Sequence, residues 1–322
     1  MKKITLENLG NVFRVIHYGR YVVLIGKYLW ILRDNGDLIA HKKDIVNPGR
    51  TVYLSEDRLL VECDKQKAFI LFSLETGAEL LRIAMPNYDL MKCEFVLSPD
   101  DAYIYSIYDR KGTYYFQQIN TQDWTCSSFP LLQCNGALYD IICDAKGVPC
   151  ILESYYQMID GTHVSENGIR YVWPDDIMPG SAFYWKSKWT LPFPQAAYRF
   201  VLNAETVLTN RLWLYDVSDG TTINLLENET RWQLPTESLC HACFTHDGRY
   251  IILTYLRCNV VLDIQARTVV AEYAADFKIG CLIGDKFWLP TSTGVEQKEF
   301  PAFEEIPPQK YKFWGSVISS KS

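Results

Sequence analysis

The sequence has few of the residues, and none of the common motifs, from which catalytic sites are built. It contains only five histidines in 322 residues. The phosphate-binding pattern GxxxxGK followed by Ser or Thr, the dinucleotide pattern GxGxxG, the nucleophile pattern GxSxG and the zinc-protease pattern HExxH do not occur in it. These absences argue against the motif-defined classes of nucleotide-binding protein, serine hydrolase and metalloprotease. We predict no catalytic residue, no metal site and no cofactor.

Long apolar runs and an excess of basic residues are also missing. The apolar stretch at 21–25 is too short to cross a membrane, and Glu7, Asn8 and Arg14 interrupt any signal-peptide pattern. The 32 basic residues are outnumbered by 38 acidic residues, which gives a net charge of −6. Because nucleic-acid binding needs clustered Lys and Arg, we expect neither a nucleic acid nor a membrane as partner.

The ten cysteines are scattered along the chain rather than grouped. Several alternate with apolar neighbours in strand-like runs, as Cys63 and Cys143 do. This usage is typical of small buried residues in a reducing compartment rather than of a disulfide framework. The sequence therefore predicts free thiols and a cytoplasmic location.

Helical periodicity is absent as well, and a repeated strand-and-turn pattern stands in its place. No convincing run of ten or more residues places apolar side chains at i, i+3 and i+4. Aromatic residues reach 14%, and they favour strands. An apolar run followed by a polar turn ends at positions 36, 77, 122, 220 and 267, at intervals of 41, 45, 98 and 47 residues. The long interval fits two units, with one degraded copy between them.

A second repeated element lies upstream of these turns. The segments 97–104 and 244–251 each place a tight polar turn between two strands, and 53–60 is a weaker copy. The Asp247-Gly248 step is a strong hairpin signal. Four strands in a unit of about 45 residues indicate a propeller blade. The sequence therefore predicts an all-β fold, a seven-bladed β-propeller of four-stranded antiparallel blades, formed by 1–322 as a single domain.

The turns at 98–103 and 245–250 resemble the SPDG-R-Y turn of WD-repeat-like β-propellers, and 214–220 resembles their third strand and the turn that follows it. The resemblance extends over roughly 10–300 and concerns architecture. The Gly-His and Trp-Asp dipeptides of true WD repeats are absent. Propellers of this kind mostly act as rigid platforms for protein partners, and the resemblance implies the same role here.

Two parts of the chain depart from the repeat. The fourth unit offers strands at 138–144 and 149–155, after which 157–198 keeps no clear register. Within it, 173–198 is irregular and rich in proline and aromatic residues, and proline is excluded from central strands. The last unit offers strands at 287–291 and 294–300, before a less regular closing region at 301–322. We expect 311–318, 4–6 or both to close the ring.

The segment 240–246 combines two cysteines and two histidines, a composition that suggests zinc or redox chemistry. The repeat places 240–244 on a strand, however, where alternate side chains face opposite ways. Cys240 and Cys243 then point apart, whereas His241 and Cys243 share a face. We interpret the cysteines as structural residues and His246 as a turn residue, with zinc binding as the alternative.

Partner-binding residues are predicted where the repeat is most disturbed, because repeat proteins carry binding functions in such departures. The candidates are Trp173, Tyr184, Trp185 and Trp189. The alternative is that these rings fill space between blades. The predicted function is a non-enzymatic protein-interaction platform, a scaffold subunit of a larger cytoplasmic assembly. The alternative is an enzyme or small-ligand binder of lactonase or hydrolase type that uses the mouth of the central channel.

Overall fold

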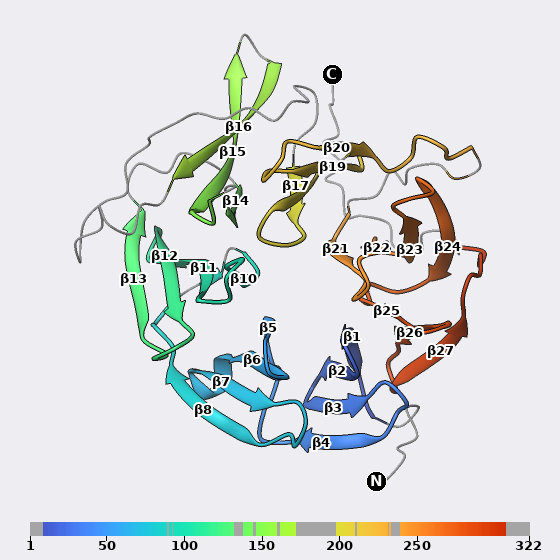
Figure 1. Ribbon diagram of the computed structural model, residues 1–322, viewed down its shortest axis with the longest axis horizontal. Helices are drawn as coiled ribbons and strands as arrows, with labels where there is room; N and C mark the ends of the chain where they lie inside the picture. The colour runs from blue at the N-terminus through green and yellow to red at the C-terminus, as the bar shows by residue number, and fades with distance from the viewer. Residues whose placement is uncertain are drawn as a thin grey trace, which may run out of the picture.

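The computed structural model describes residues 9–88, 90–91, 93–131, 138–143, 146–159, 162–171, 198–209, 211–230, 232 and 239–306. The strands of this part of the chain form seven antiparallel sheets, which we number in chain order. The sheets stand side by side in a ring, with their early strands nearest the central axis and their late strands at the rim (Figure 1). We call the region around this axis the central channel. The protein is an all-β propeller, as the sequence predicts.

The strands follow one another outward in sequence order within each sheet, except that the short first strand of sheet three pairs with the third strand of that sheet. Sheet one is β1 (Val12–Tyr18), β2 (Tyr21–Gly26), β3 (Leu29–Arg33) and β4 (Leu38–Lys42), and sheet two is β5 (Thr51–Leu54), β6 (Arg58–Cys63), β7 (Ala68–Ser73) and β8 (Glu79–Ala84). Sheet three is β9 (Leu90–Met91), β10 (Val96–Leu97), β11 (Tyr103–Arg110), β12 (Thr113–Asn120) and β13 (Cys126–Leu131). Sheet four is β14 (Leu138–Cys143), β15 (Pro149–Ile159) and β16 (Thr162–Tyr171).

The second half of the ring continues in the same way. Sheet five is β17 (Tyr198–Val201), β18 (Thr206–Thr209), β19 (Trp213–Asp216) and β20 (Thr222–Asn224), and sheet six is β21 (His241–Phe244), β22 (Tyr250–Thr254), β23 (Cys258–Asp263) and β24 (Thr268–Ala274). Sheet seven is β25 (Cys281–Ile283), β26 (Lys286–Pro290) and β27 (Val295–Glu299). Sheets one, two, five and six are the predicted four-stranded units, whereas sheets four and seven have three strands in the described residues. The count of seven four-stranded blades stays a prediction.

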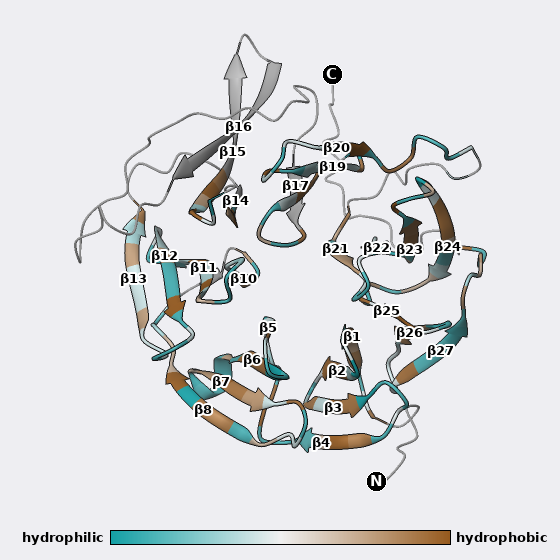
Figure 2. Ribbon diagram, in the orientation of Figure 1, coloured by the Kyte–Doolittle hydropathy of each residue, from teal (hydrophilic) through white to brown (hydrophobic). Residues whose placement is uncertain are grey.

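Apolar side chains between neighbouring sheets form the core. Residues of high hydropathy recur along the strands of the ring (Figure 2). Separate clusters join sheets one and two, two and three, three and four, four and five, and five and six. A further cluster joins sheets six, seven and one. Because a twisted sheet cannot cover its own two faces, each sheet depends on both neighbours for burial.

The two predicted hairpin turns share one hydrogen-bond pattern. Ser98 Oγ donates to Asp100 Oδ1 at 2.6 Å, and Thr245 Oγ1 donates to Asp247 Oδ1 at the same distance. In each turn the hydroxyl oxygen also accepts the amide hydrogen of the residue five positions on, at 2.9 and 3.0 Å. Gly248 has φ +67°, a conformation that L side chains rarely adopt. The weaker copy at 53–60 turns differently.

The outer turns are confirmed with one correction. Gly36, Gly77 and Gly220 have φ angles of 86°, 68° and 76°, and Arg267 takes the same left-handed conformation at 56°. In the looser copy the left-handed residue is Trp124, at φ 61°, rather than the residue at 122. The amide of Trp124 donates to the carbonyl of Asn120 at 2.9 Å, so this turn closes two residues later than predicted.

The strands test two further points of the repeat. Of the residues on its third strands, Phe72 and Val261 are buried, whereas Trp213 is only partly buried. The loss of register predicted for 157–198 is wrong at its start, because β15 and β16 pair continuously to residue 171. The segment 172–197 lies outside the described residues, as do 4–6 and 311–318.

The ring closes where the first sheet meets the seventh, a junction that we call the seam, and β1 forms hydrogen bonds across it. The Val15 amide donates to the Ile279 carbonyl and the Ile279 amide to the Phe13 carbonyl, both at 2.9 Å. After β27 the chain returns along the outer edge of sheet six, where Glu272 and Phe303 form a parallel bridge. The predicted strands of 287–291 and 294–300 are confirmed as β26 and β27.

Replacing Phe72 by Ala should lower the free energy of unfolding by about 3–5 kcal/mol, because its buried ring packs between sheets one and two. Leu80→Ala on the neighbouring β8 is the control, since Leu80 is 52% exposed and should change stability by about 0.5 kcal/mol or less. Urea denaturation measures both. Equal losses for the two variants would contradict the proposed core.

Candidate functional site

The predicted partner-binding residues Trp173, Tyr184, Trp185 and Trp189 lie outside the described residues, so their arrangement stays a prediction. The second candidate region, 240–246, is described. Its strand is β21, the innermost strand of sheet six, as the repeat predicts. His241 and Cys243 both lie near Arg14 of β1. The described part of this candidate region therefore lies on the inner strands, beside the central channel.

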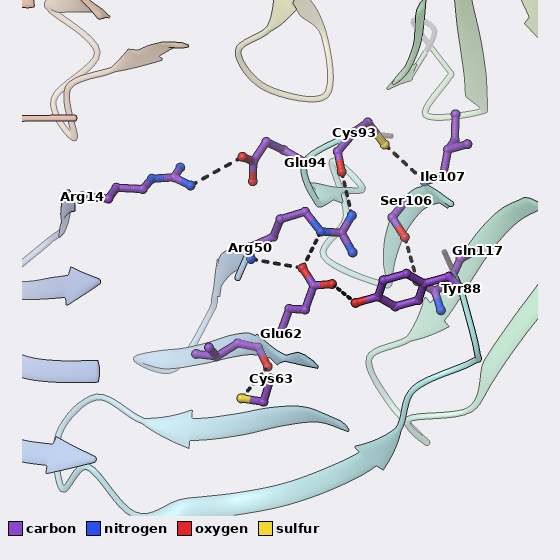
Figure 3. Close-up of polar contacts among 11 residues, drawn as sticks. Arg14, Arg50, Glu62, Cys63, Tyr88, Cys93, Glu94, Ser106, Ile107 and Gln117 are labelled. Carbon is purple, nitrogen blue, oxygen red and sulfur yellow. Dashed lines mark hydrogen bonds and ion pairs between the residues drawn. The ribbon is translucent and has the colours of Figure 1, made fainter. Parts of the chain in front are cut away.

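Arg14 connects three sheets across the channel. Its Nη2 lies 3.3 Å from Nε2 of His241, and its Nη1 lies 3.5 Å from Oε1 of Glu94 (Figure 3). Burial opposes the charge of Arg14, but the Glu94 carboxylate, together with Tyr18 and Cys243, outweighs the effect of burial, so the pKa of Arg14 lies above its ordinary value. The guanidinium therefore stays charged and paired.

The contact with Arg14 fixes the state of His241. A guanidinium only donates, so Nε2 of His241 accepts and the ring proton belongs on Nδ1. Burial, followed by the charge of Arg14, lowers the pKa of His241 to about 3. His241 is therefore neutral at physiological pH and is unsuited to proton transfer there.

A buried network positions the segment that carries Glu94. Nε of Arg50 donates to Glu62 Oε2 at 2.8 Å, and its Nη1 donates to the carbonyl of Cys93 at 2.6 Å (Figure 3). The hydroxyl of Tyr88 donates to the other oxygen of Glu62. Tyr88 and Cys93 belong to the chain segment that leads to Glu94. Their hydrogen bonds with Glu62 and Arg50 therefore connect this segment to sheet two.

Glycine is needed where the network meets the backbone. A Cβ at Gly49 would lie 2.7 Å from Oε2 of Glu62. The carboxylate is thus packed directly against the chain, and it accepts the amide hydrogen of Arg50 at 3.1 Å.

A cavity of about 380 Å³ lies among the inner strands, next to Glu94. Its wall is formed by the end of β1, by β5, by the segment from Glu94 to the end of β10, by β14, and by the β17–β18 turn. The polar lining includes the carboxylates of Glu94 and Asp140 and the hydroxyls of Tyr18, Thr51 and Tyr53. Polar groups from distant parts of the sequence therefore converge on one enclosed space.

Burial makes two cysteines of the inner and core strands unreactive, Cys243 near Arg14 and Cys63 on β6 of sheet two. Burial raises the pKa of Cys243 to about 11 and that of Cys63 to about 12. A thiol attacks as its thiolate, so these groups are poor nucleophiles near neutral pH. In the described ranges no group of three or more His, Cys, Asp or Glu side chains has the geometry to hold a metal ion.

Two histidines meet at the end of β1. The rings of His17 and His246 lie 5.6 Å apart, edge to face. Burial, followed by the neighbouring His246, lowers the pKa of His17. His246 belongs to the turn after β21, as predicted, and its ring also lies 3.8 Å from where a Cβ on Gly19 would be.

Sequence reasoning did not identify the channel residues Arg14, Tyr18, Glu94 and Asp140. One signal was available, since Arg14 stands inside the apolar run Val12–Tyr18 on the innermost strand. Glu94 lies in a connecting segment, where a carboxylate carries no such signal.

Comparison with known proteins gives the fold and no family. No protein-family model matches the chain, and no curated protein matches it. Among solved structures, hydrazine synthase of Kuenenia stuttgartiensis superposes with a TM-score of 0.56 at 10% identity, over 92% of this chain and 97% of that one. A streptogramin B lyase gives a TM-score of 0.57 at 11% identity, over 92% and 95% of the two chains.

The β-propeller domain of Cps50 (Swd1) from Myceliophteria thermophila gives a TM-score of 0.53 at 11% identity, over 90% of this chain and 97% of that one. The expected resemblance to WD-repeat-like β-propellers is thereby confirmed at the level of architecture. At these identities the likeness shows the fold alone. Within the described ranges, no helix is long and apolar enough to span a membrane.

The pKa of His241 gives a prediction for acid stability. Between its ordinary pKa of 6.5 and about 3, the unfolded chain binds a proton that the folded protein excludes. The free energy of unfolding should therefore decrease as the pH is lowered through this range, and His241 should contribute at most about 1.4 kcal/mol per pH unit to the decrease. His241→Gln should flatten the decline, measured by urea denaturation at pH 7, 6, 5 and 4. Parallel profiles for variant and parent would refute the assignment.

Cysteine reactivity gives a second prediction. The nine described cysteines are free thiols, and most of them are buried. Alkylation at pH 8 should be slow in the native protein, whereas thiol titration in denaturant without reductant should recover all ten cysteines of the sequence. Recovery of eight or fewer would indicate a disulfide.

Proposed function

We propose that the protein is a non-enzymatic interaction platform, a propeller subunit of a larger cytoplasmic assembly. The observation that carries this proposal is the paired state of the channel groups. Arg14 is held by Glu94 and His241, and Cys243 beside it is a protonated thiol at neutral pH. An acid–base or nucleophilic site needs groups poised near the working pH instead.

The partner site is proposed on the segment 173–198. Trp173, Tyr184, Trp185 and Trp189 supply aromatic rings of the kind that dominate interface energies. Lys186 and Lys188 stand among them in the sequence, which favours an acidic or extended peptide as partner. We further propose that the seven sheets correspond to seven blades of the ring.

The alternative function, a ligand binder or enzyme at the channel, keeps one supporting observation. The cavity beside Glu94 is lined by residues from five parts of the ring and carries several polar groups. The fold neighbours include a lyase and a synthase as well as a Swd1 propeller domain, so the fold does not decide between the two functions.

The double variant Trp185→Ala/Trp189→Ala tests the platform. We expect it to melt within about 2 °C of the parent and to lose a stoichiometric partner that the tagged parent captures from native lysate. Leu80→Ala, which removes an exposed apolar side chain on the outer strand of sheet two, is the matched control and should retain the partner. A large drop in melting temperature with partner capture intact would show that the two indoles belong to the core.

A further inference from the structure

The outer strand of sheet six, β24, is covered by a segment that follows sheet seven. After β27 the chain runs along this edge parallel to β24, and we call residues 301–306 the strap. The Glu272 amide donates to the carbonyl of Ala302, and the Glu304 amide donates to the carbonyl of Glu272, both at 2.9 Å. The strap therefore pairs with sheet six as a partner peptide does when it adds a strand to a sheet edge.

A carboxylate site lies beside these backbone hydrogen bonds. Oε2 of Glu304 accepts the amide hydrogen of Ala274 at 3.0 Å. Nζ of Lys298, on β27, donates to both oxygens of Glu304, at 2.8 and 3.0 Å. The Lys298 side chain is only 19% exposed. Because a strand amide and a mostly buried ammonium group converge here, the edge selects a carboxylate at one position of the segment that pairs with it.

The other end of the same edge also receives a carboxylate. Oε2 of Glu229, in the segment after β20, accepts the amide hydrogen of Val269 at 2.7 Å and the hydroxyl hydrogen of Thr268 at 2.6 Å. An uncovered strand edge presents amides that pair with other chains. On β24, acidic side chains from two separate parts of the chain satisfy such amides, so this edge favours acidic segments.

The strap is held firmly at its base, where it leaves sheet seven. The hydroxyl of Tyr273 donates to the carbonyl of Glu299 at 2.9 Å. The ring of Phe300 packs edge to face on that of Tyr250, with 5.4 Å between the ring centroids. The start of the strap is therefore fixed against sheet six.

Beyond its base the strap has few contacts. Ala302 and Ile306 are only partly buried against the core clusters, and Phe303 between them is 64% exposed. A segment with little buried apolar area can open while the rest of the fold stays intact. The strap can thus leave β24 without unfolding the ring.

We propose that the β24 edge is a binding site for an extended segment of a partner protein, and that the strap occupies this site when the partner is absent. The partner segment has the pattern of 302–306: a small apolar residue, any residue, Glu, any residue and an aliphatic residue. Its Glu binds Lys298 and the Ala274 amide. This goes beyond the platform function, because it adds a second contact, of stated chemistry, to the one proposed at 173–198.

A labelled, capped peptide with the strap sequence Pro-Ala-Phe-Glu-Glu-Ile tests the site by fluorescence anisotropy. The parent should bind it weakly, because the tethered strap competes at a high effective concentration. Glu304→Ala/Ile306→Ala, which loosens the strap and leaves β24 and Lys298 in place, should bind it at least tenfold more tightly. Binding to neither protein, or equal binding to both, would overturn the proposal.

Matched substitutions test the carboxylate site in the loosened variant. Within the peptide, Glu304→Gln should reduce affinity about tenfold, whereas Glu305→Gln, at a position that is exposed in the strap, should not. In the protein, Lys298→Met should reduce affinity about tenfold, whereas Lys286→Met, on the neighbouring β26, should not. Equal effects within either pair would refute the site.

Amide hydrogen exchange of the parent tests the strap without a variant, in case the loosened protein does not fold. Amides of the strap should exchange at least tenfold faster than those of β23 in the same sheet. Exchange as slow as that of β23 would show that the strap opens only with the whole ring, and would overturn the proposal. The tryptophan double variant affects none of these outcomes, so the two proposals fail separately.

Discussion

Burial of apolar side chains between neighbouring sheets is the interaction on which the rest of the structure depends. Each sheet has two apolar faces and too few residues to cover either, so no sheet is stable by itself. Apolar clusters join each of sheets one to six to the next, and a further cluster is shared by sheets six, seven and one. Together they make the packing continuous around the ring. The backbone hydrogen bonds of β1 with the residues before β25 hold the seam in register.

Closure of the ring brings together the polar side chains at its centre. Arg14, Glu94 and His241 are remote in sequence: Arg14 is on β1, His241 is on β21, and Glu94 is in the segment that leads into β10. They meet only because the inner strands of all sheets face one axis. The Arg50–Glu62 ion pair of sheet two then holds the segment that leads to Glu94, because Arg50 also donates to the carbonyl of Cys93. Packing at the periphery thus determines the polar geometry at the centre, and a loss of core packing should disturb both.

The sequence predicted the parts of the fold that depend on local chemistry. The turns at Gly36, Gly77 and Gly220 could be predicted because the left-handed conformation excludes most side chains. The turns at Ser98 and Thr245 could be predicted because their hydroxyl groups form hydrogen bonds within a few residues. Trp124 takes the same conformation without any sequence signal. The channel contacts could not be predicted, because they form between sheets and leave no periodicity. The predicted tryptophan site lies outside the described residues and stays a prediction.

The arrangement around Arg14 shows how the fold holds a buried charge at its centre. The guanidinium contacts Glu94 through Nη1 and His241 through Nη2, so these two partners do not compete for one nitrogen. His241 is neutral at physiological pH, so the ion pair among these three residues is that of Arg14 with Glu94. Because burial alone would lower the pKa of Arg14, the inner strand can carry this charge only where the ring brings the partners of Arg14 within reach.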